Sequence, residues 1–176
     1  MSDMKALHVI ATVPVGHAPL ALTVSPGRDR LYVTNVQSSD LSVLGAETLE
    51  TLDTVKVGSV PYGVAVTPNS ERVFITNQQS GSVSVMDAEA LVVTYKTKVG
   101  RYPEGVVIGS KAYGANWASG DISVLNRETG AGASPHQGKL RRARLGYRSR
   151  GLRFTLRHRC HRGRLPCASP AGMIGS

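Results

Sequence analysis

The chain has 176 residues, 41% of them hydrophobic, which allows one domain of ordinary size with a buried core. Its net charge of +9 would favour nucleic-acid or membrane binding, but residues 1–138 carry 10 basic and 12 acidic residues, so the excess lies in residues 139–176. It contains no apolar run of about 18 residues and no signal-peptide core, so we expect no membrane span and, by default, a cytoplasmic location. Both cysteines, Cys160 and Cys167, come after residue 138, so no disulfide framework supports the rest.

The first 138 residues are built from a repeat. The segment Val15–Pro19, which contains a Gly-x-x-Pro turn, returns at Val57–Pro61 and Val99–Pro103, and each copy begins 42 residues after the last. A fixed period between about 20 and 50 residues is the signature of stacked repeat architectures. The period therefore indicates the fold class before any single residue is considered.

Residues 7–15 have the pattern of an outer strand that belongs to a preceding unit or closes a ring. We then expect repeat units at about 19–57, 61–99 and 103–126. In the second unit, four β-type runs are separated by turns rich in Pro, Asn, Ser and Gly. These runs are Tyr62–Thr67, Arg72–Asn77, Ser82–Asp87 and Leu91–Val99. Four strands joined by short hairpins predict one antiparallel sheet per unit.

The side-chain pattern predicts how these sheets associate. In the third strand of the first unit, Leu41 and Val43 take one face while Ser42 and Leu44 take the other, so neither face is reliably polar. The first strands carry small residues, as expected where sheets crowd around a narrow axis. These are Ala21, Gly63, Ala65 and Gly105. We therefore predict an all-β fold, a partial β-propeller of about three four-stranded antiparallel blades, followed by a disordered basic tail.

An asparagine recurs where the second strand of each unit ends, at Asn35, Asn77 and Asn116. Asparagine tolerates left-handed backbone and can hydrogen-bond a turn with its side chain. We expect a structural role for these residues rather than a ligand-binding one.

The run Tyr32-Val33-Thr34-Asn35, followed by a Ser-rich turn and Leu41–Leu44, resembles the YVTN family of β-propeller repeats. Phe74–Asn77 and Tyr113–Asn116 are progressively looser copies. The motif positions are Tyr32, Val33, Thr34, Asn35, Gly58, Pro61, Asn77, Gly100, Pro103 and Asn116. The resemblance implies a propeller commonly of seven blades, often exported to the periplasm or cell surface. It implies no single activity and no catalytic residue set.

The repeat changes character after Asn126. The spacing that carries the outer strand is nine residues in the earlier units, from Leu49 to Gly58 and from Leu91 to Gly100, but only two from Gly130 to Gly132. From Lys139 onwards, 11 basic residues occur without an acidic one. Three hypotheses are open for residues 139–176: a disordered solvated tail, an out-of-frame sequence that replaces later blades, or a basic arm that binds nucleic acid.

Other candidate sites are weak. The cluster His158, Cys160, His161 and Cys167 lacks the paired spacing of zinc sites. His17 and His136 lie at the Gly-x-x-Pro turns, where a ligand role is open but exposed turn histidines are the commoner outcome. The acidic residues Asp40, Asp87 and Asp121 sit at strand or turn ends and form no carboxylate pair in sequence. Trp117, the single tryptophan, is expected in blade-to-blade packing. We predict no catalytic, cofactor or metal residues.

The sequence favours a non-enzymatic interaction module for a protein or surface partner. The partner is expected to be another protein or further propeller blades, including those of a second copy, because an open arc of three blades leaves apolar faces exposed. Two alternatives stay open: a remnant of a propeller enzyme or ligand-binding propeller, and a nucleic-acid-binding protein that acts through its tail.

Overall fold

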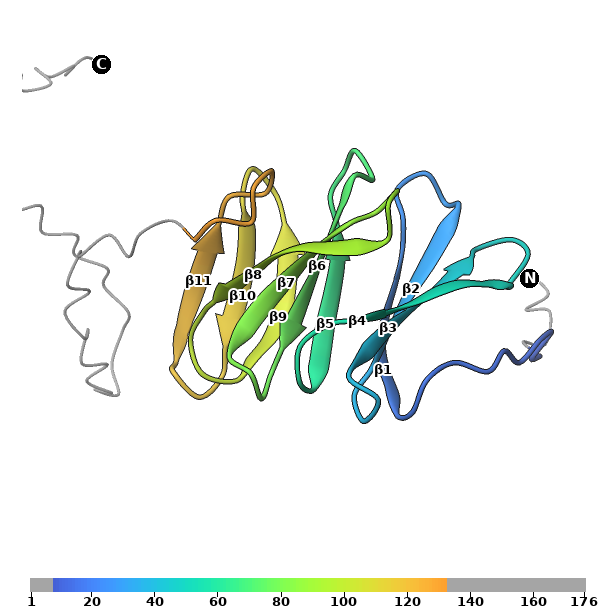
Figure 1. Cartoon of the computed structure of the whole chain (residues 1–176), viewed down its shortest axis with the longest axis horizontal. Coiled ribbons are helices and arrows are strands. Elements are labelled where there is room, and N and C mark those ends of the chain that lie inside the picture. The colour runs from blue at the N-terminus through green and yellow to red at the C-terminus, as the bar shows by residue number, and fades with distance from the viewer. Residues whose placement is uncertain (1–7, 133–176) are drawn as a thin grey trace, which may run out of the picture. The chain divides into compact units, whose positions relative to one another are not determined.

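The computed structural model describes residues 8–132 of the chain (Figure 1). These residues form eleven strands and no helix, which confirms the all-β prediction. The strands are β1 (Pro19–Val24), β2 (Arg30–Asn35), β3 (Asp40–Gly45), β4 (Thr51–Lys56), β5 (Pro61–Val66), β6 (Arg72–Asn77), β7 (Ser82–Asp87), β8 (Val92–Lys98), β9 (Pro103–Ile108), β10 (Ala112–Asn116) and β11 (Asp121–Leu125).

The strands form three antiparallel sheets, in which neighbours along the chain are neighbours in the sheet. We call them blade 1 (β1–β4), blade 2 (β5–β8) and blade 3 (β9–β11). In blade 2 the middle strands β6 and β7 have the predicted bounds, while β5 and β8 differ from prediction by a residue at each end. The hydrophobic alternation and the turn residues were therefore sufficient to locate the strands.

The two ends of the repeat region differ from the predicted strand set. Residues 8–15, within the predicted outer strand 7–15, form no strand, because β4 already holds the outer position of blade 1 and the described residues include no preceding blade. Blade 3 has three strands instead of four, as the shortened sequence after Asn126 indicated. Among the described residues, the outer edge of β11 makes one isolated bridge, between Leu125 and Gly132. The predicted tail 139–176 lies outside the described residues.

The turn that precedes an outer strand nevertheless forms in blade 3. In blade 2, Asp87 Oδ1 accepts hydrogen bonds from the backbone N–H groups of Glu89 and Ala90, at 3.1 and 3.0 Å. In blade 3, Asn126 Oδ1 accepts the corresponding bonds from Glu128 and Thr129, at 2.8 and 3.0 Å. This Asx turn reverses the chain in both blades and is encoded by the local sequence alone.

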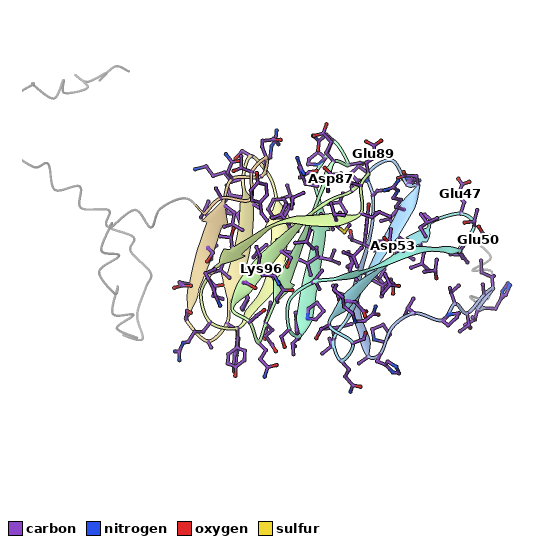
Figure 2. The ribbon with its side chains drawn as sticks, viewed as in Figure 1. Glu47, Glu50, Asp53, Asp87, Glu89 and Lys96 are labelled. Carbon is purple, nitrogen blue, oxygen red and sulfur yellow. The ribbon has the colours of Figure 1, made fainter. Side chains whose placement is uncertain are left out.

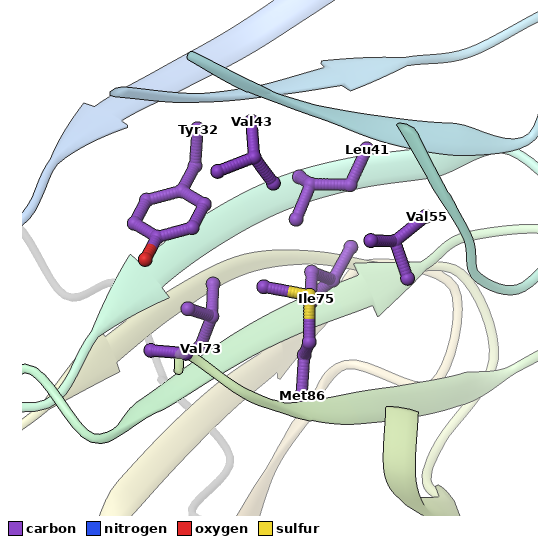
Figure 3. Packing of buried hydrophobic residues seen from close by; sticks show 8 residues of the cluster. Tyr32, Leu41, Val43, Val55, Val73, Ile75 and Met86 are labelled. Atoms are coloured by element: carbon purple, nitrogen blue, oxygen red, sulfur yellow. The ribbon is translucent and has the colours of Figure 1, made fainter. Parts of the chain in front are cut away.

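Blade 2 packs on both of its faces. Val73, Ile75 and Met86 point to blade 1, where they meet Tyr32, Leu41, Val43 and Val55 in one buried cluster (Figure 3). The opposite face carries Phe74, Val83 and Val85, which pack with Ala112 and Leu125 of blade 3. The first strands of the blades, which we call inner strands, contact one another in the order β1, β5, β9. Sheets that stack face to face and share one crowded edge have the radial arrangement predicted from the sequence.

Candidate interaction surface

The recurrent asparagines join the second strand of each blade to the third. Asn77 is fully buried, and its Nδ2 donates to Ser84 Oγ at 2.9 Å, while its Oδ1 accepts from the backbone N–H of Gly58 at 2.9 Å. The Nδ2 atoms of Asn35 and Asn116 donate to Ser42 and Ser123 in the same way. All three side chains thus link the second strand to the third strand, and Asn77 also links them to the Gly-x-x-Pro turn.

The asparagines do not have the left-handed backbone conformation that asparagine tolerates; a neighbouring turn residue has it instead. None of the three has a positive φ; the residue before the proline of each Gly-x-x-Pro turn does, with φ of 55° at Ala18, 56° at Val60 and 51° at Tyr102. The turn requires glycine because there is no room for a side chain at this position. A Cβ at Gly58 or Gly100 would overlap the side chain of the asparagine beneath it.

The motif threonine has a role that the sequence did not indicate, because its partner lies in another blade. Thr34 Oγ1 donates to the backbone oxygen of Tyr62 at 3.2 Å, and Thr76 Oγ1 donates to that of Glu104 at 2.6 Å. Both threonines are fully buried and connect a second strand to the inner strand of the following blade. Ala115 occupies this position in blade 3 and is exposed. Blade 3 therefore lacks the donor that ties each preceding blade to its neighbour.

Inner strands approach each other most closely at Gly63. A Cβ at this residue would overlap the backbone oxygen of Glu104 in the next inner strand. At the corresponding Gly105 nothing lies within 4 Å of such a Cβ. The predicted need for small residues on inner strands is real at Gly63, where a following blade is present.

The aspartates are structural supports. Asp40 accepts hydrogen bonds from Asn35 Nδ2 and Ser38 Oγ, both at 2.8 Å, and from Lys56 Nζ at 3.0 Å. Burial acts to raise the pKa of Asp40, but the hydrogen bonds from Asn35, Lys56 and Ser38 outweigh it and hold the pKa below its ordinary value. Asp121 accepts a bond from Asn116 at 2.7 Å. These carboxylates are occupied in holding strands together.

The outward face of blade 3 is apolar and uncovered by any described residue. We call it the open face of blade 3, and it consists of Val107, Tyr113, Ala115, Ile122 and Val124. Val107 is 65% exposed and Ile122 is 66% exposed. At the positions of Ile122 one and two repeats earlier, Val83 and Leu41 are fully buried. The open face thus repeats the pattern of an interblade face, and a hollow of about 340 Å³ indents it between Glu104 and Ile122.

An aromatic pair borders this face at the turns. Trp117 lies edge-on to Tyr102, with ring centroids 6.2 Å apart and an interplanar angle of 66°. The Trp117 backbone N–H donates to the Tyr102 oxygen at 2.9 Å, which joins the β10–β11 turn to the Gly-x-x-Pro turn. Trp117 is 73% exposed, so the expectation of blade-to-blade packing is wrong for the described structure. One repeat earlier this position is held by Gln78, whose Nε2 donates to Glu104 Oε1 of the following blade at 2.8 Å. No described blade follows blade 3, so no such neighbour covers Trp117.

Blade 1 has an uncovered region at the opposite end of the array. Its inner strand exposes Leu20 by 50%, Leu22 by 68% and Val24 by 46%. The preceding segment also exposes Val9 by 82% and Ile10 by 89%. The outward side of the middle strands of blade 1 is buried, since Val33 is 7% and Leu44 is 1% exposed. The exposed apolar side chains at this end therefore belong to β1 and to the segment before it.

The remaining candidates do not gather into a site. Within residues 8–132, no three His, Cys, Asp or Glu side chains are placed to hold a metal ion. Glu47 and Glu89 are exposed on turns, whereas the half-buried Asp87 ends β7 and pairs with Arg72 at 3.0 Å (Figure 2). His17 is exposed in its turn. The described part of the chain also has no helix of the length and apolarity that a membrane crossing requires. The sequence candidates that lie outside the described residues are His136, His158, Cys160, His161 and Cys167.

The structure is similar to known β-propellers. Hydrazine synthase from Kuenenia stuttgartiensis is 27% identical, with a TM-score of 0.63 over 75% of this chain and 38% of that one. The β-propeller domain of Swd1 from Myceliophteria thermophila is 11% identical, with a TM-score of 0.61 over 71% of this chain and 40% of that one. The WD40 repeats of RRP9 are 12% identical, with a TM-score of 0.62 over 69% of this chain and 39% of that one.

These likenesses confirm the partial β-propeller fold. This chain spans 38–40% of the length of the three structures, so it corresponds to an arc of each. No family model and no curated protein matches the sequence.

Proposed function

We propose that the chain is a non-enzymatic protein-interaction module of the β-propeller type, built from YVTN-like repeats, which binds a protein partner through the open face of blade 3. The observation that carries this proposal is the exposure of Ile122, which occupies a position that is buried in both other blades. An exposed apolar face made of several neighbouring side chains, such as this one, marks an interaction site.

The residues around this face have the composition of an interaction surface. Trp117 lines the hollow in this face, Tyr102 packs against Trp117, and Arg101 bonds the same turn. Tryptophan, tyrosine and arginine are the side chains most enriched at binding hot spots. Arg101 is held in place, since its Nη2 donates to the Ala118 oxygen at 3.1 Å. A side chain that is already ordered loses less conformational entropy on binding.

The polar groups inside the blades have structural roles. Asn77, Thr76 and Asp40 make hydrogen bonds that hold strands or blades together. A second candidate function, nucleic-acid binding, would depend on residues 139–176, which lie outside the described structure.

A photoreactive amino acid at position 122 tests the proposal directly. We expect covalent adducts with protein when the full chain is irradiated in its own cells. The matched control places the same amino acid at Tyr95, which is 50% exposed on the outer strand of blade 2. Adducts from position 122 alone would support the proposal. No adducts, or the same adducts from both positions, would contradict it.

A further inference from the structure

We propose that the protein partner supplies an extended segment, which completes blade 3 as its fourth strand and is held there by a lysine side chain. This inference rests on the proposed function and names the chemistry of the partner. Blade 3 has three strands where blades 1 and 2 have four, and the described residues pair with the outer edge of β11 only through the Leu125–Gly132 bridge. The unpaired edge of a sheet accepts an added strand through backbone hydrogen bonds.

The fourth strands of blades 1 and 2 end in the same way. Each finishes with a β-branched residue and a lysine, and valine and glycine follow. The lysine side chain bonds to the turn between the second and third strands of its blade. Lys56 Nζ donates to the backbone oxygen of Ser38 at 3.0 Å. Lys98 Nζ donates to that of Ser80 at the same distance.

The valine after the lysine makes a second bond to this turn. Its backbone N–H donates to the oxygen of Ser39 in blade 1, at 3.3 Å, and to that of Gly81 in blade 2, at 3.0 Å. In blade 1 the lysine also donates to Asp40 Oδ2 at 3.0 Å. Two or three acceptors of the turn thus hold the end of each fourth strand.

Blade 3 has the same turn without the strand that binds to it. Ser119, Gly120 and Asp121 occupy the three acceptor positions. Gly120 has a φ of 67°, close to the 54° and 55° of its counterparts in blades 1 and 2, and Asp121 accepts the bond from Asn116. Among residues 8–132, no donor bonds to the backbone oxygens of Ser119 and Gly120, and Asp121 is in no ion pair. The acceptors for a fourth strand are therefore already in place.

The charges around this turn favour a cation. The hollow beside the turn is lined by Glu104 and Asp121 and by no basic residue. Arg101 contacts the turn, but its guanidinium donates to the Ala118 oxygen at 3.1 Å and forms an ion pair with neither carboxylate. An ammonium group at this turn would gain the charge-assisted bond that Lys56 makes to the corresponding carboxylate in blade 1.

The sequence of this chain does not repeat the lysine ending after blade 3. Asn77 and Asn116 hold the same strand position, 39 residues apart. At this spacing the counterpart of Lys98 is Gln137, two residues after Pro135, and both lie outside the described residues. Glutamine carries no charge, and proline has no N–H to give to a ladder. We therefore expect the lysine to come from another protein.

The register of the added strand follows from blade 2. There Lys98 opposes Ser82, the counterpart of Asp121. The residue before the lysine opposes Val83, the counterpart of Ile122. The partner segment thus places its lysine at Asp121 and a β-branched residue beside Ile122, where it extends the open face of blade 3.

A peptide with the sequence of residues 91–99, which contains the fourth strand of blade 2, is the probe for this site. We expect it to bind the full chain, and the same peptide with Lys98→Gln to bind about two- to fivefold more weakly, as for an exposed ion pair. Asp121→Ser in the chain installs the residue that blade 2 carries at this position. It should weaken binding of the lysine peptide by a similar factor and leave binding of the glutamine peptide unchanged, as measured by calorimetric titration.

Glu128→Ser is the matched control, because it removes an exposed carboxylate of the same blade that pairs with Arg127. It should leave the affinity for both peptides unchanged. The proposal is overturned if the lysine peptide does not bind, if both peptides bind equally, or if Asp121→Ser and Glu128→Ser have equal effects.

A disulfide tests the register. In a Cys160→Ser, Cys167→Ser background, Ile122→Cys should form a disulfide with the peptide that carries Thr97→Cys, because directly opposed residues have Cβ atoms close together. The peptide with Lys96→Cys is the control, since its cysteine points to the other face of the sheet. No disulfide, or equal yields from the two peptides, would contradict the strand addition.

The photoreactive amino acid at position 122 separates this inference from the proposed function. Protein adducts at position 122 together with a peptide that does not bind would overturn the strand addition and leave the proposed function standing. Lysine-dependent binding of the peptide without protein adducts would do the reverse.

Discussion

Blades 2 and 3 have nearly the same sequence pattern but different surroundings. Blade 2 is covered on both faces, and Phe74, Val83 and Val85 are fully buried against blade 3. Blade 3 carries Tyr113, Ile122 and Val124 at the corresponding positions, where no described residue covers them. The comparison shows that the burial of this face depends on the blade that follows, because the same strand positions are core in blade 2 and surface in blade 3.

Replacing a large side chain by a small one should give the largest difference in stability loss between blades 2 and 3. We expect Phe74→Ala to lower the free energy of unfolding by about 3–5 kcal/mol, because it empties the centre of the blade 2–3 cluster. Tyr113→Ala, at the matching position of blade 3, should cost about 1 kcal/mol. Urea denaturation of the two variants, at a concentration that keeps the chain monomeric, measures both. Equal losses would mean that blade 3 is as deeply packed as blade 2.

The buried asparagine gives the next largest contrast. Asn77→Ala removes the acceptor of the Gly58 N–H and the donor to Ser84 in a fully buried place, so we expect a loss of about 2–3 kcal/mol. Asn116→Ala should cost less, because the N–H of Gly100 bonds to Ser123 Oγ instead, at 3.4 Å. Thermal unfolding of both variants provides the measurement. A greater loss of stability in Asn116→Ala than in Asn77→Ala would contradict this difference in hydrogen bonding.

Glycine substitution sharpens the comparison at the inner strands. Gly63→Ala should cost about 1–2 kcal/mol, because the added methyl group meets the Glu104 backbone oxygen, which cannot move without shifting β9. Gly105→Ala should leave stability almost unchanged, since its surroundings are open. Chemical denaturation of the two alanine variants decides the matter, and a matched loss at both sites would show that inner strands do not crowd at Gly63.

Lowering the pH should produce the smallest of these changes in the free energy of unfolding. The hydrogen bond from Ser25 lowers the pKa of Asp29, and the Ala90 backbone N–H lowers that of Asp87; burial opposes the lowering in Asp40, but its hydrogen bonds prevail. Because these pKa values are lowered on folding, the unfolded chain binds more protons than the folded one just below the ordinary value of 3.8. The free energy of unfolding should therefore be constant above about pH 5 and fall below pH 4.

The variant Asp40→Asn tests the contribution of the blade 1 carboxylate to this dependence. It removes one titrating group, so the fall in stability between about pH 4 and pH 2 should be shallower than in the unmodified chain. An unchanged slope would show that Asp40 does not contribute.

The strands could be predicted from the sequence because their signals are local. The turn chemistry and the alternation in β6 and β7 fix both strands to the residue. The exposure of Trp117 could not be predicted, since it depends on whether a further blade packs against blade 3. The link from Thr76 to Glu104 was also missed, because its acceptor is a backbone oxygen in another blade, which sequence patterns do not identify. Residues 9–14 have a strand pattern but form no strand, since the outer position of blade 1 is held by β4.

Hydrogen exchange at single amides is the most direct measurement of this account, in which stacking between blades determines stability. At a concentration where the chain is monomeric, the amides of Val83–Met86 in β7 should be the slowest to exchange, and those of Asp121–Val124 in β11 should exchange much faster. Equal protection of β7 and β11 would contradict the claim that a neighbouring blade makes the difference.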